Sequence, residues 1–541
     1  MTTHAPAAPV LLQIEAMDIV SYIFGTNVQR EHIGASWLVT QLPRWFASAC
    51  DSESVDVLVS VSGKLLAKVE SAQAAKKIVT AVSCAALDEA PELDICGAWV
   101  SLPGDEVTVG DMRRAAVALE EARSLRVSMD AASPTIPFLD VCRVSNRPAV
   151  PELGTTGEWA RDKKIALSES SRRKRVKAQD FRSHLLKVLE NGGISEENAT
   201  RLLPHLKELE EAADDDSTGI TELEWVGVVH ADVNHLTSAL YGGNAEAVHA
   251  VDPRELRERT RQIGQAIESA YVAGAKAVLI QADAASPKKR VNVLPLFPIM
   301  LGGDDLTVVV HGHYALTFAV EYAKALRAAT AADDSPLRSL TDDHSGFRAA
   351  IGVALVKPHF PYHLAAALAT ALCDRSKQAS RAESMVDFEV VYDSVHIDLD
   401  GIRGRDPVPS LRPLRVEGVG AGSWCGLVAA ARAVVGDGDK DRGMPSGQLA
   451  ALRDEVRRPG SPPTDPELSE AAAKRWSRLA HQYPRSAQSL GDGEGRVVWD
   501  DRPSSRRVSQ LFDVKALLDV SPVSLVRLLA EGSCGSEGYG R

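Results

Sequence analysis

Two adjacent aspartates lie where a tight glycine turn joins two apolar segments. The turn is Gly302-Gly303-Asp304-Asp305, between the apolar runs 293–300 and 306–310. Glycine adopts positive φ without a steric clash, so a Gly-Gly pair readily closes a β-hairpin. Such a hairpin presents two carboxylates at its rim and leaves room for a phosphate to approach the backbone. A plain surface turn is the alternative, because Gly and Asp are common turn residues.

A third carboxylate, Asp232, ends the apolar strand 226–231. In a β-α-β-β-α-β sheet the first strand lies beside the central hairpin, so we expect Asp232 to converge with Asp304 and Asp305. Carboxylates about 4 Å apart repel each other by about 4 kcal/mol per pair near a protein surface. Mg²⁺ relieves such repulsion and usually binds one or two carboxylates together with substrate phosphates. The three residues therefore predict metal-dependent chemistry on a nucleoside triphosphate.

Lys377 is the candidate for a phosphate-binding cation. It lies on a predicted helix, 361–381, one strand before the palm domain closes. A lysine ammonium binds the β- and γ-phosphates as a point charge. From the residues alone, an ordinary exposed helical lysine is the alternative.

The elements that must position these side chains follow the order of a ferredoxin-like palm domain. Strands are predicted over 225–230, 276–281, 347–356 and 387–392, with the hairpin over 291–310. Helices are predicted over 253–273, 315–329 and 361–381. The order β-α-β-β-α-β with extra edge elements indicates one palm domain around the three carboxylates.

A similar alternation precedes it, with strands predicted at 11–14, 55–61 and 95–100 and helices at 33–49, 71–88 and 109–124. At 541 residues the chain is also too long for one hydrophobic core. We therefore predict an α/β (α+β) protein with two ferredoxin-like palm domains, a helical connector and a helical C-terminal domain. The predicted domains are a non-catalytic first palm (1–150), the connector (151–218), the catalytic second palm (219–400) and the C-terminal domain (401–541).

The bulk composition narrows the class of protein. The hydrophobic fraction of 45% and the charged fraction of 25% are typical of a soluble globular chain. The net charge of −12 argues against a surface that coats nucleic acid, because phosphate binding needs clustered Lys and Arg. One basic run, 172–177 followed by Arg182, is either a local patch or a solvated helix face.

The seven cysteines are scattered without a CxxC pair, which disfavours a structural zinc and fits reduced thiols. No apolar run reaches the roughly 18 residues that span a bilayer, and the first residues lack a basic segment. We expect a cytoplasmic protein without a membrane anchor.

These motifs resemble those of the large subunit of type III CRISPR effector complexes, the Cas-ten or Cmr-two palm-polymerase family. The similarity covers Val226–Asn234, the GGDD hairpin, Ile351–Ala354, Lys357–Pro361 and Ser376-Lys377. Nearer the start, Tyr22–Asn27, Arg30-Glu31 and Gly34–Ser36 resemble the opening of the family's first palm domain. The similarity spans most of residues 10–395, and Met444–Leu449 resembles the family's last domain more weakly.

The resemblance implies a complete nucleotide site. It implies two Mg²⁺ (or Mn²⁺) ions at Asp232, Val233, Asp304 and Asp305, and nucleotide binding by Gly302, Gly303, Asn234, Ser376 and Lys377. The family joins ATP molecules 3′ to 5′ into cyclic oligoadenylates, second messengers of antiviral defence. Implied partners are ATP, guide-RNA-containing subunits and target RNA, or copies of the chain itself if it acts alone.

Three departures limit what carries over from the family. The chain contains no His-Asp dipeptide, on which the family's nuclease domain depends, so DNA cleavage is not expected. Cys142 stands alone where the family has cysteine pairs, so the connector must fold without zinc. The first palm has Ser62-Gly63-Lys64 in place of an acidic turn, which predicts a scaffold or a second nucleotide pocket.

Three functions compete at this point. The first is an enzyme that makes cyclic oligoadenylates, within a complex or alone. The second is a non-catalytic nucleotide- or RNA-binding large subunit of an RNA-guided complex, which three intact aspartates disfavour. The third is a diguanylate cyclase, whose usual GGDEF or GGEEF turn is replaced here by Asp305-Leu306.

Overall fold

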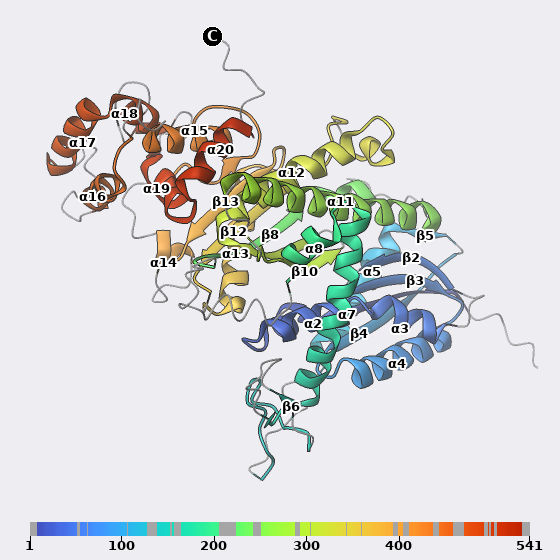
Figure 1. The fold of residues 1–541 in the computed structure, drawn as a ribbon. Coiled ribbons are helices and arrows are strands. Elements are labelled where there is room, and N and C mark those ends of the chain that lie inside the picture. Colours follow the sequence, from blue (N-terminus) through green and yellow to red (C-terminus); the bar gives the residue numbers. More distant parts are fainter. Residues whose placement is uncertain are drawn as a thin grey trace, which may run out of the picture.

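The structure is a computed structural model of the chain. It describes residues 8–50, 55–61, 63–104, 106–126, 138–151, 154–155, 164–204, 223–241, 250–286, 291, 293–302, 305–341, 343–358, 360–392, 399–403, 410–436, 443–457, 470–491, 496, 499–501 and 506–532. Two sheets and a C-terminal group of helices form the bulk of it (Figure 1). Helix α7 (Glu169–Asn191) stands between the two sheets, and α11 (Pro253–Ala285) runs across the top of the view and contacts β2 of the first sheet and β10 of the second.

The first sheet has four strands in the order β2-β3-β1-β4, and each neighbouring pair is antiparallel. The strands are β1 (Val10–Met17), β2 (Val55–Val61), β3 (Lys64–Val69) and β4 (Asp94–Ser101). Helices α4 (Ala72–Glu89) and α5 (Val109–Ser124) pack on the sheet. Leu11 of β1 packs in one cluster with Met112 of α5, whereas Leu12 belongs to the main core. Because successive side chains point to opposite faces, β1 is buried on both sides.

Three helices connect β1 to β2: α1 (Ile19–Phe24), α2 (Gln29–Val39) and α3 (Leu42–Ala49). The prediction of one helix over 33–49 is wrong, because the chain breaks between α2 and α3. Pro43 lies in the first turn of α3, where its missing N–H costs no helical hydrogen bond. The break lets α2 point toward the second sheet, where the Ser36 hydroxyl donates to the Ile299 carbonyl oxygen.

The second sheet has six strands in the order β10-β11-β8-β12-β13-β14. They are β8 (Val226–Val233), β10 (Leu296–Gly302), β11 (Asp305–His311), β12 (Ala349–Val356), β13 (Met385–Val390) and β14 (Leu414–Arg415). The longer helices are α11 (Pro253–Ala285), α12 (Ala315–Ala331) and α13 (Tyr362–Ala379). Shorter elements are α10 (Leu236–Tyr241), η1 (Gly312–Tyr314), η2 (Pro336–Leu340) and the paired strands β5 (Val107–Thr108) and β9 (Ala250–Val251).

The strand predicted over 276–281 does not exist, because α11 continues through it to Ala285. Within this apolar run Val278 and Leu279 are buried while Ile280 is 69% exposed. That spacing follows the helical period, whereas a strand would alternate. A short apolar run of this kind fits a strand or a buried helix equally well. Without a strand at 276–281, the order β-α-β-β-α-β is unchanged.

Both sheets repeat one topology. With β1, β2, β3 and β4 matched to β8, β10, β11 and β12, each sheet places the first strand between the hairpin and the fourth strand. This is the ferredoxin-like arrangement, so the prediction of an α/β protein with two palm-type sheets is confirmed. The sixth strand of the second sheet follows residue 400, and the predicted domain limits at 150, 218 and 400 remain predictions.

The connector contains α7 (Glu169–Asn191), α8 (Glu196–Leu202) and the short paired strands β6 (Gly154–Thr155) and β7 (Lys164–Ile165). Its basic run divides between the two expectations: Lys174, Arg175 and Arg182 are buried, whereas Arg172, Arg173 and Lys177 are half-buried and pair with carboxylates of the same helix. The Arg175 Nε lies 2.7 Å from an oxygen of Glu31, itself fully buried on α2. The Lys174 Nζ donates to the Tyr22 carbonyl oxygen at 2.7 Å, so Lys174 and Arg175 join the connector to the first palm, whereas Arg182 donates to the Leu203 carbonyl oxygen within the connector.

A cluster of small polar side chains surrounds Cys142, where the sequence predicts a connector without zinc. The Cys142 thiol lies 3.7 Å from the Ser171 hydroxyl, and the Ser145 and Ser168 hydroxyls are 3.3 Å apart. In the described residues no group of three or more His, Cys, Asp or Glu is placed to hold a metal. Elsewhere, Cys425 is disulfide-bonded, so the expectation that all thiols are reduced is wrong for that residue.

Beyond β14, the described residues of the C-terminal region form helices and one small hairpin. Its elements are α14 (Leu399–Arg403), α15 (Trp424–Val435), α16 (Ser446–Arg457), α17 (Glu470–Gln482), α18 (Pro484–Leu490), α19 (Leu511–Val520), α20 (Val523–Gly532), β15 (Trp499–Asp501) and β16 (Arg506–Val508). Arg412, buried against the second sheet, holds Asp513 of α19 at 2.7 Å. This buried pair couples the helices to the palm beside them.

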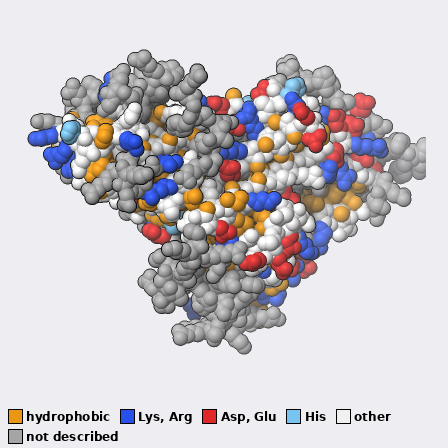
Figure 2. All heavy atoms as spheres, turned by 45° about the horizontal axis from the view of Figure 1, so that its top comes forward, with side chains coloured by type: hydrophobic (Ala, Val, Ile, Leu, Met, Phe, Trp, Pro, Cys, Tyr) orange, Lys and Arg blue, Asp and Glu red, His pale blue; other side chains and the backbone are white. Residues whose placement is uncertain are grey.

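The surface carries mixed charge. On the face drawn in Figure 2, acidic and basic side chains of the described residues are interspersed. No helix among the described residues is long and apolar enough to cross a membrane.

Candidate active site

Two of the three predicted carboxylates lie side by side at the edge of the second sheet. Asp305, the first residue of β11, pairs directly with Asp232 near the end of β8. Directly opposed residues of antiparallel strands have their Cβ atoms about 5 Å apart and share a face of the sheet. Like charges at such positions repel each other, so this edge favours a cation.

The hairpin turn is present where the sequence predicts it. Gly302 of β10 pairs with Asp305 of β11, which leaves a two-residue connection. Gly302 has φ of 148°, a backbone conformation that side chains disfavour, so glycine is needed there. Gly303 and Asp304 lie outside the described residues, and their predicted roles remain predictions.

Lys377 points at Asp232. Its Nζ lies 3.0 Å from Asp232 Oδ1 and 3.9 Å from Asp374 Oδ1. Burial alone lowers the pKa of Lys377, but the hydrogen bond and charge of Asp232 outweigh burial and raise the pKa above its ordinary value. The ammonium therefore stays charged at neutral pH. The Asp232 side chain is still 20% exposed, and its Oδ2 has no partner among the described residues.

Helix α13 holds Lys377 because it packs unusually close to β12. A Cβ at Gly352 would lie 2.0 Å from the backbone oxygen of Ala369, so only glycine allows this approach. The Ser376 hydroxyl donates to the Ile351 carbonyl oxygen at 2.9 Å, and Ser376 is fully buried. Ser376, predicted to bind nucleotide, thus fixes the helix in this structure, and a direct contact with nucleotide remains a prediction.

On the same face of the sheet, His230 and Thr307 form the next cross-strand pair behind the two carboxylates. The His230 Nδ1 and the Thr307 Oγ1 are 3.0 Å apart. Burial lowers the pKa of His230, and the nearby charge of Asp232 only partly offsets that effect. A neutral histidine therefore supports the floor of the site. Sequence reasoning missed it, although its two-residue spacing from Asp232 places both on one face of β8.

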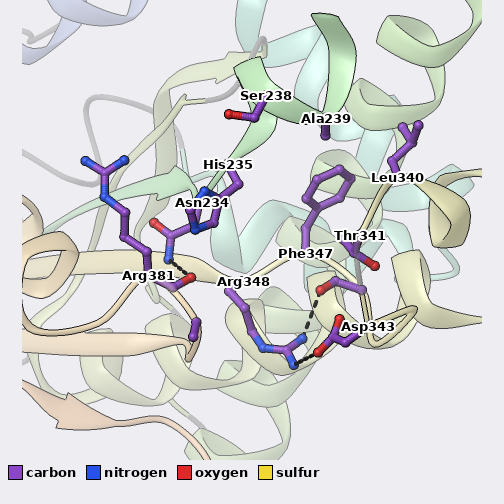
Figure 3. Close-up of a pocket in the computed structure, with 12 residues that line it drawn as sticks. Asn234, His235, Ser238, Ala239, Leu340, Thr341, Asp343, Phe347, Arg348 and Arg381 are labelled. Carbon is purple, nitrogen blue, oxygen red and sulfur yellow. Dashed lines mark hydrogen bonds and ion pairs between the residues drawn. The ribbon is translucent and has the colours of Figure 1, made fainter. Parts of the chain in front are cut away.

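The segment after Asp232 turns sharply. Val233 is buried and pairs with Ala349 of β12, and Asn234 is buried at 4% exposure. His235 then adopts a left-handed conformation with φ of 61°, which is uncommon for a residue other than glycine. Figure 3 shows Asn234 and His235 among the residues that line a cavity of about 340 Å³.

The first sheet has a different pair at the equivalent edge. Lys64, the first residue of β3, pairs with Glu15 of β1, as Asp305 pairs with Asp232. The Lys64 Nζ lies 3.1 Å from Glu15 Oε1. This edge is therefore neutralised by its own lysine.

Two palm-type sheets, one with paired carboxylates at its edge, define the chain as a two-palm protein. No family model matches the chain, and no curated protein matches it in sequence.

The fold is that of solved Csm1 structures. The Csm1-Csm4 cassette in complex with cA3 gives a TM-score of 0.51 at 12% identity over 96% of this chain and 69% of that chain. The cassette in complex with cA4 gives 0.50 at 13% identity over 97% of this chain and 69% of that chain. Csm1 in T. onnurineus gives 0.50 at 14% identity over 96% and 70%. The chain thus shares the two-palm fold of this type III CRISPR subunit across nearly its whole length.

Proposed function

We propose that this protein is a metal-dependent nucleotidyltransferase that converts ATP into cyclic oligoadenylates in a type III CRISPR-like antiviral defence. The observation that carries the proposal is the direct pairing of Asp232 with Asp305 beside Lys377. Shared fold with structures that contain cA3 and cA4 supports the product class.

The residues fit a divalent cation. Two carboxylates opposed across neighbouring strands leave net negative charge that one lysine does not balance. Asp232, Asp304 and Asp305 would hold Mg²⁺ or Mn²⁺. When bound, the metal would acidify the attacking 3′-hydroxyl and stabilise the leaving pyrophosphate.

The protein's own groups orient the reaction. The 3′-oxygen of one ATP attacks the α-phosphate of another; an O–P bond forms, the bond to the β-phosphate bridging oxygen breaks, and pyrophosphate leaves. Lys377, charged and held by Asp232, supplies positive charge next to the phosphates. The neutral His230 behind Asp232 adds no competing charge. Positioning and charge neutralisation therefore carry the reaction without a protein base.

The proposal also covers the protein's partners and its cellular compartment. Partners would be ATP, Csm4-like and guide-RNA-containing subunits and target RNA, with the cytoplasm as the compartment. A non-catalytic subunit that binds nucleotide only for assembly is the alternative.

Product analysis tests the proposal. Purified protein is incubated with Mg²⁺ or Mn²⁺ and each labelled NTP, with and without target RNA, and products are resolved by mass. We expect cyclic oligoadenylates from ATP with wild type and none with Asp304→Ala/Asp305→Ala. Absence of product from wild type under every condition would favour the non-catalytic subunit. Equal turnover by the double variant would reject the site, and a cyclic dinucleotide from GTP would favour a diguanylate cyclase.

A further inference from the structure

A lysine ammonium lies between two carboxylates at the edge of the second sheet. The Lys377 Nζ is 3.0 Å from Asp232 Oδ1 and 3.9 Å from Asp374 Oδ1. Asp374 precedes Lys377 by three residues on α13, so the two side chains lie on the same side of the helix. Among the described residues, the Asp374 side chain has no other hydrogen bond or ion pair. The ammonium therefore has a second carboxylate within reach.

The two carboxylates differ in exposure. The Asp232 side chain is 20% exposed and lies opposite Asp305, whereas the Asp374 side chain is 57% exposed. A half-buried carboxylate that faces a like charge gains more from a cation than an exposed carboxylate does, because water screens the exposed charge. Lys377 accordingly lies nearer to Asp232 than to Asp374.

The backbone of α13 is tied to β12 on both sides of Asp374. The Cys373 thiol donates to the Ala350 carbonyl oxygen at 3.2 Å. The Ser376 hydroxyl donates to the Ile351 carbonyl oxygen at 2.9 Å. A lysine carries its ammonium on a flexible four-carbon stem, so a change of rotamer brings the ammonium from one carboxylate to the other without moving the helix.

Resting on the proposed function, we propose that Asp374 is a positioning residue that takes the Lys377 ammonium from Asp232 when a divalent cation binds there. A divalent cation on the Asp232 carboxylate repels an ammonium on the same group, because like charges this close interact strongly where water is partly excluded. The move to Asp374 relieves that repulsion and keeps a positive charge at the same edge of the sheet. Lys377 thus occupies Asp232 until the cation binds, and Asp374 makes its release easier.

Binding of Mn²⁺ alone tests this exchange without turnover. Electron paramagnetic resonance of free Mn²⁺ gives its Kd for the full chain at about 0.15 M salt. We expect Lys377→Met to bind Mn²⁺ about tenfold more tightly than wild type, because the competing ammonium is gone. Asp374→Asn should bind Mn²⁺ about fivefold more weakly than wild type. Asp374→Glu keeps the charge and should restore the wild-type affinity.

The double variant distinguishes this exchange from direct attraction of the metal by Asp374. If Asp374 acts through Lys377, Asp374→Asn changes the Mn²⁺ affinity less than about twofold in the Lys377→Met background. An equal loss in both backgrounds would overturn the proposal, and so would a Lys377→Met variant that binds no more tightly than wild type. The matched control is Asp88→Asn, an exposed aspartate in the last turn of α4, which should leave the affinity unchanged. Thermal unfolding followed by circular dichroism checks that each variant is folded.

The outcomes also separate this proposal from the proposed function. Mn²⁺ binding with equal losses in both backgrounds removes the role of Asp374 and leaves the metal site standing. If wild type and Lys377→Met bind no Mn²⁺ while wild type still converts labelled ATP to a cyclic product, the exchange is overturned and the proposed function stands. Absence of both Mn²⁺ binding and product overturns both proposals.

Discussion

The two palm-type sheets share the order of their first four strands and carry different charges at one equivalent cross-strand pair. In the second sheet Asp305 faces Asp232, whereas in the first Lys64 faces Glu15. Opposite charges satisfy each other, but two carboxylates need an added cation. The common fold supplies the position, and one residue type decides whether that position is an ion site or a closed ion pair.

The hairpin turns of the two sheets also differ in charge. Gly63, with φ of 74°, leads into Lys64 in the first sheet, whereas Gly302 leads into the acidic turn of the second. Each turn needs glycine for its backbone, since both φ values disfavour side chains. Turn geometry alone therefore does not distinguish the sheet with paired carboxylates from its neighbour.

The largest expected effect comes from removing one charge of the carboxylate pair in the second sheet, and the equivalent change in the first sheet is its control. Asp305→Asn should lower cyclic oligoadenylate formation on the order of 10³-fold, because the isosteric amide loses the charge that holds the cation. Lys64→Met, at the equivalent position of the first sheet, should keep turnover within about twofold. Initial rates with labelled ATP measure both, and comparable losses would show that the first sheet also takes part in the reaction.

The next largest effect concerns stability, because glycines in both sheets lie close to a neighbouring helix. Gly352→Ala places a methyl group 2.0 Å from the backbone oxygen of Ala369, whereas Gly97→Ala in the first sheet meets the Val79 side chain at 2.6 Å. A backbone atom gives way less easily than a side chain, so we expect about 3 kcal/mol of destabilisation for Gly352→Ala and about 1 kcal/mol for Gly97→Ala. Urea unfolding at matched protein concentration compares them. Equal losses would contradict the tight packing of α13.

Lys377→Met should lower kcat/KM about tenfold by removing one charge–phosphate contact. Asp232 raises the pKa of Lys377 in the folded protein. The stabilisation from this pair is thus complete below the unfolded value of about 10.5 and is lost as pH rises through the folded pKa. The fold-difference in kcat/KM between wild type and variant should therefore stay constant from about pH 7 to 9. A difference that disappears within that range would place the folded pKa of Lys377 too low for this pairing.

The smallest effect concerns the stability of the first-sheet pair. The Lys64 and Glu15 side chains are 46% and 25% exposed. Exposed ion pairs contribute about 0.5 kcal/mol, so Glu15→Gln should shift the unfolding midpoint very little. A loss above about 2 kcal/mol would mean that the closed pair is a structural requirement of that sheet.

Much of the site followed from local patterns. Strong apolar runs bounded by glycine or by charge predicted β8, the hairpin and β12, and their order implied that Asp232 would approach the turn. Both strands are buried along nearly their whole length, so burial does not fix their register, and the direct pairing of Asp232 with Asp305 was decided by the tertiary structure. The domain limits and the metal-binding roles remain predictions.

What the sequence by itself determined was the alternation of elements and the identity of the acidic turn, because periodicity and glycine act over a few residues. Only the tertiary structure decided which charges are buried. The sequence suggests an exposed Arg175, but its side chain pairs with Glu31. The sequence also suggests that the Ser376 hydroxyl binds a ligand, but it donates to the Ile351 carbonyl oxygen. The tertiary structure also decided that 276–281 continues a helix, and that Lys64 faces Glu15. Burial and pairing depend on segments distant in the chain, and no local pattern records which partner will be there.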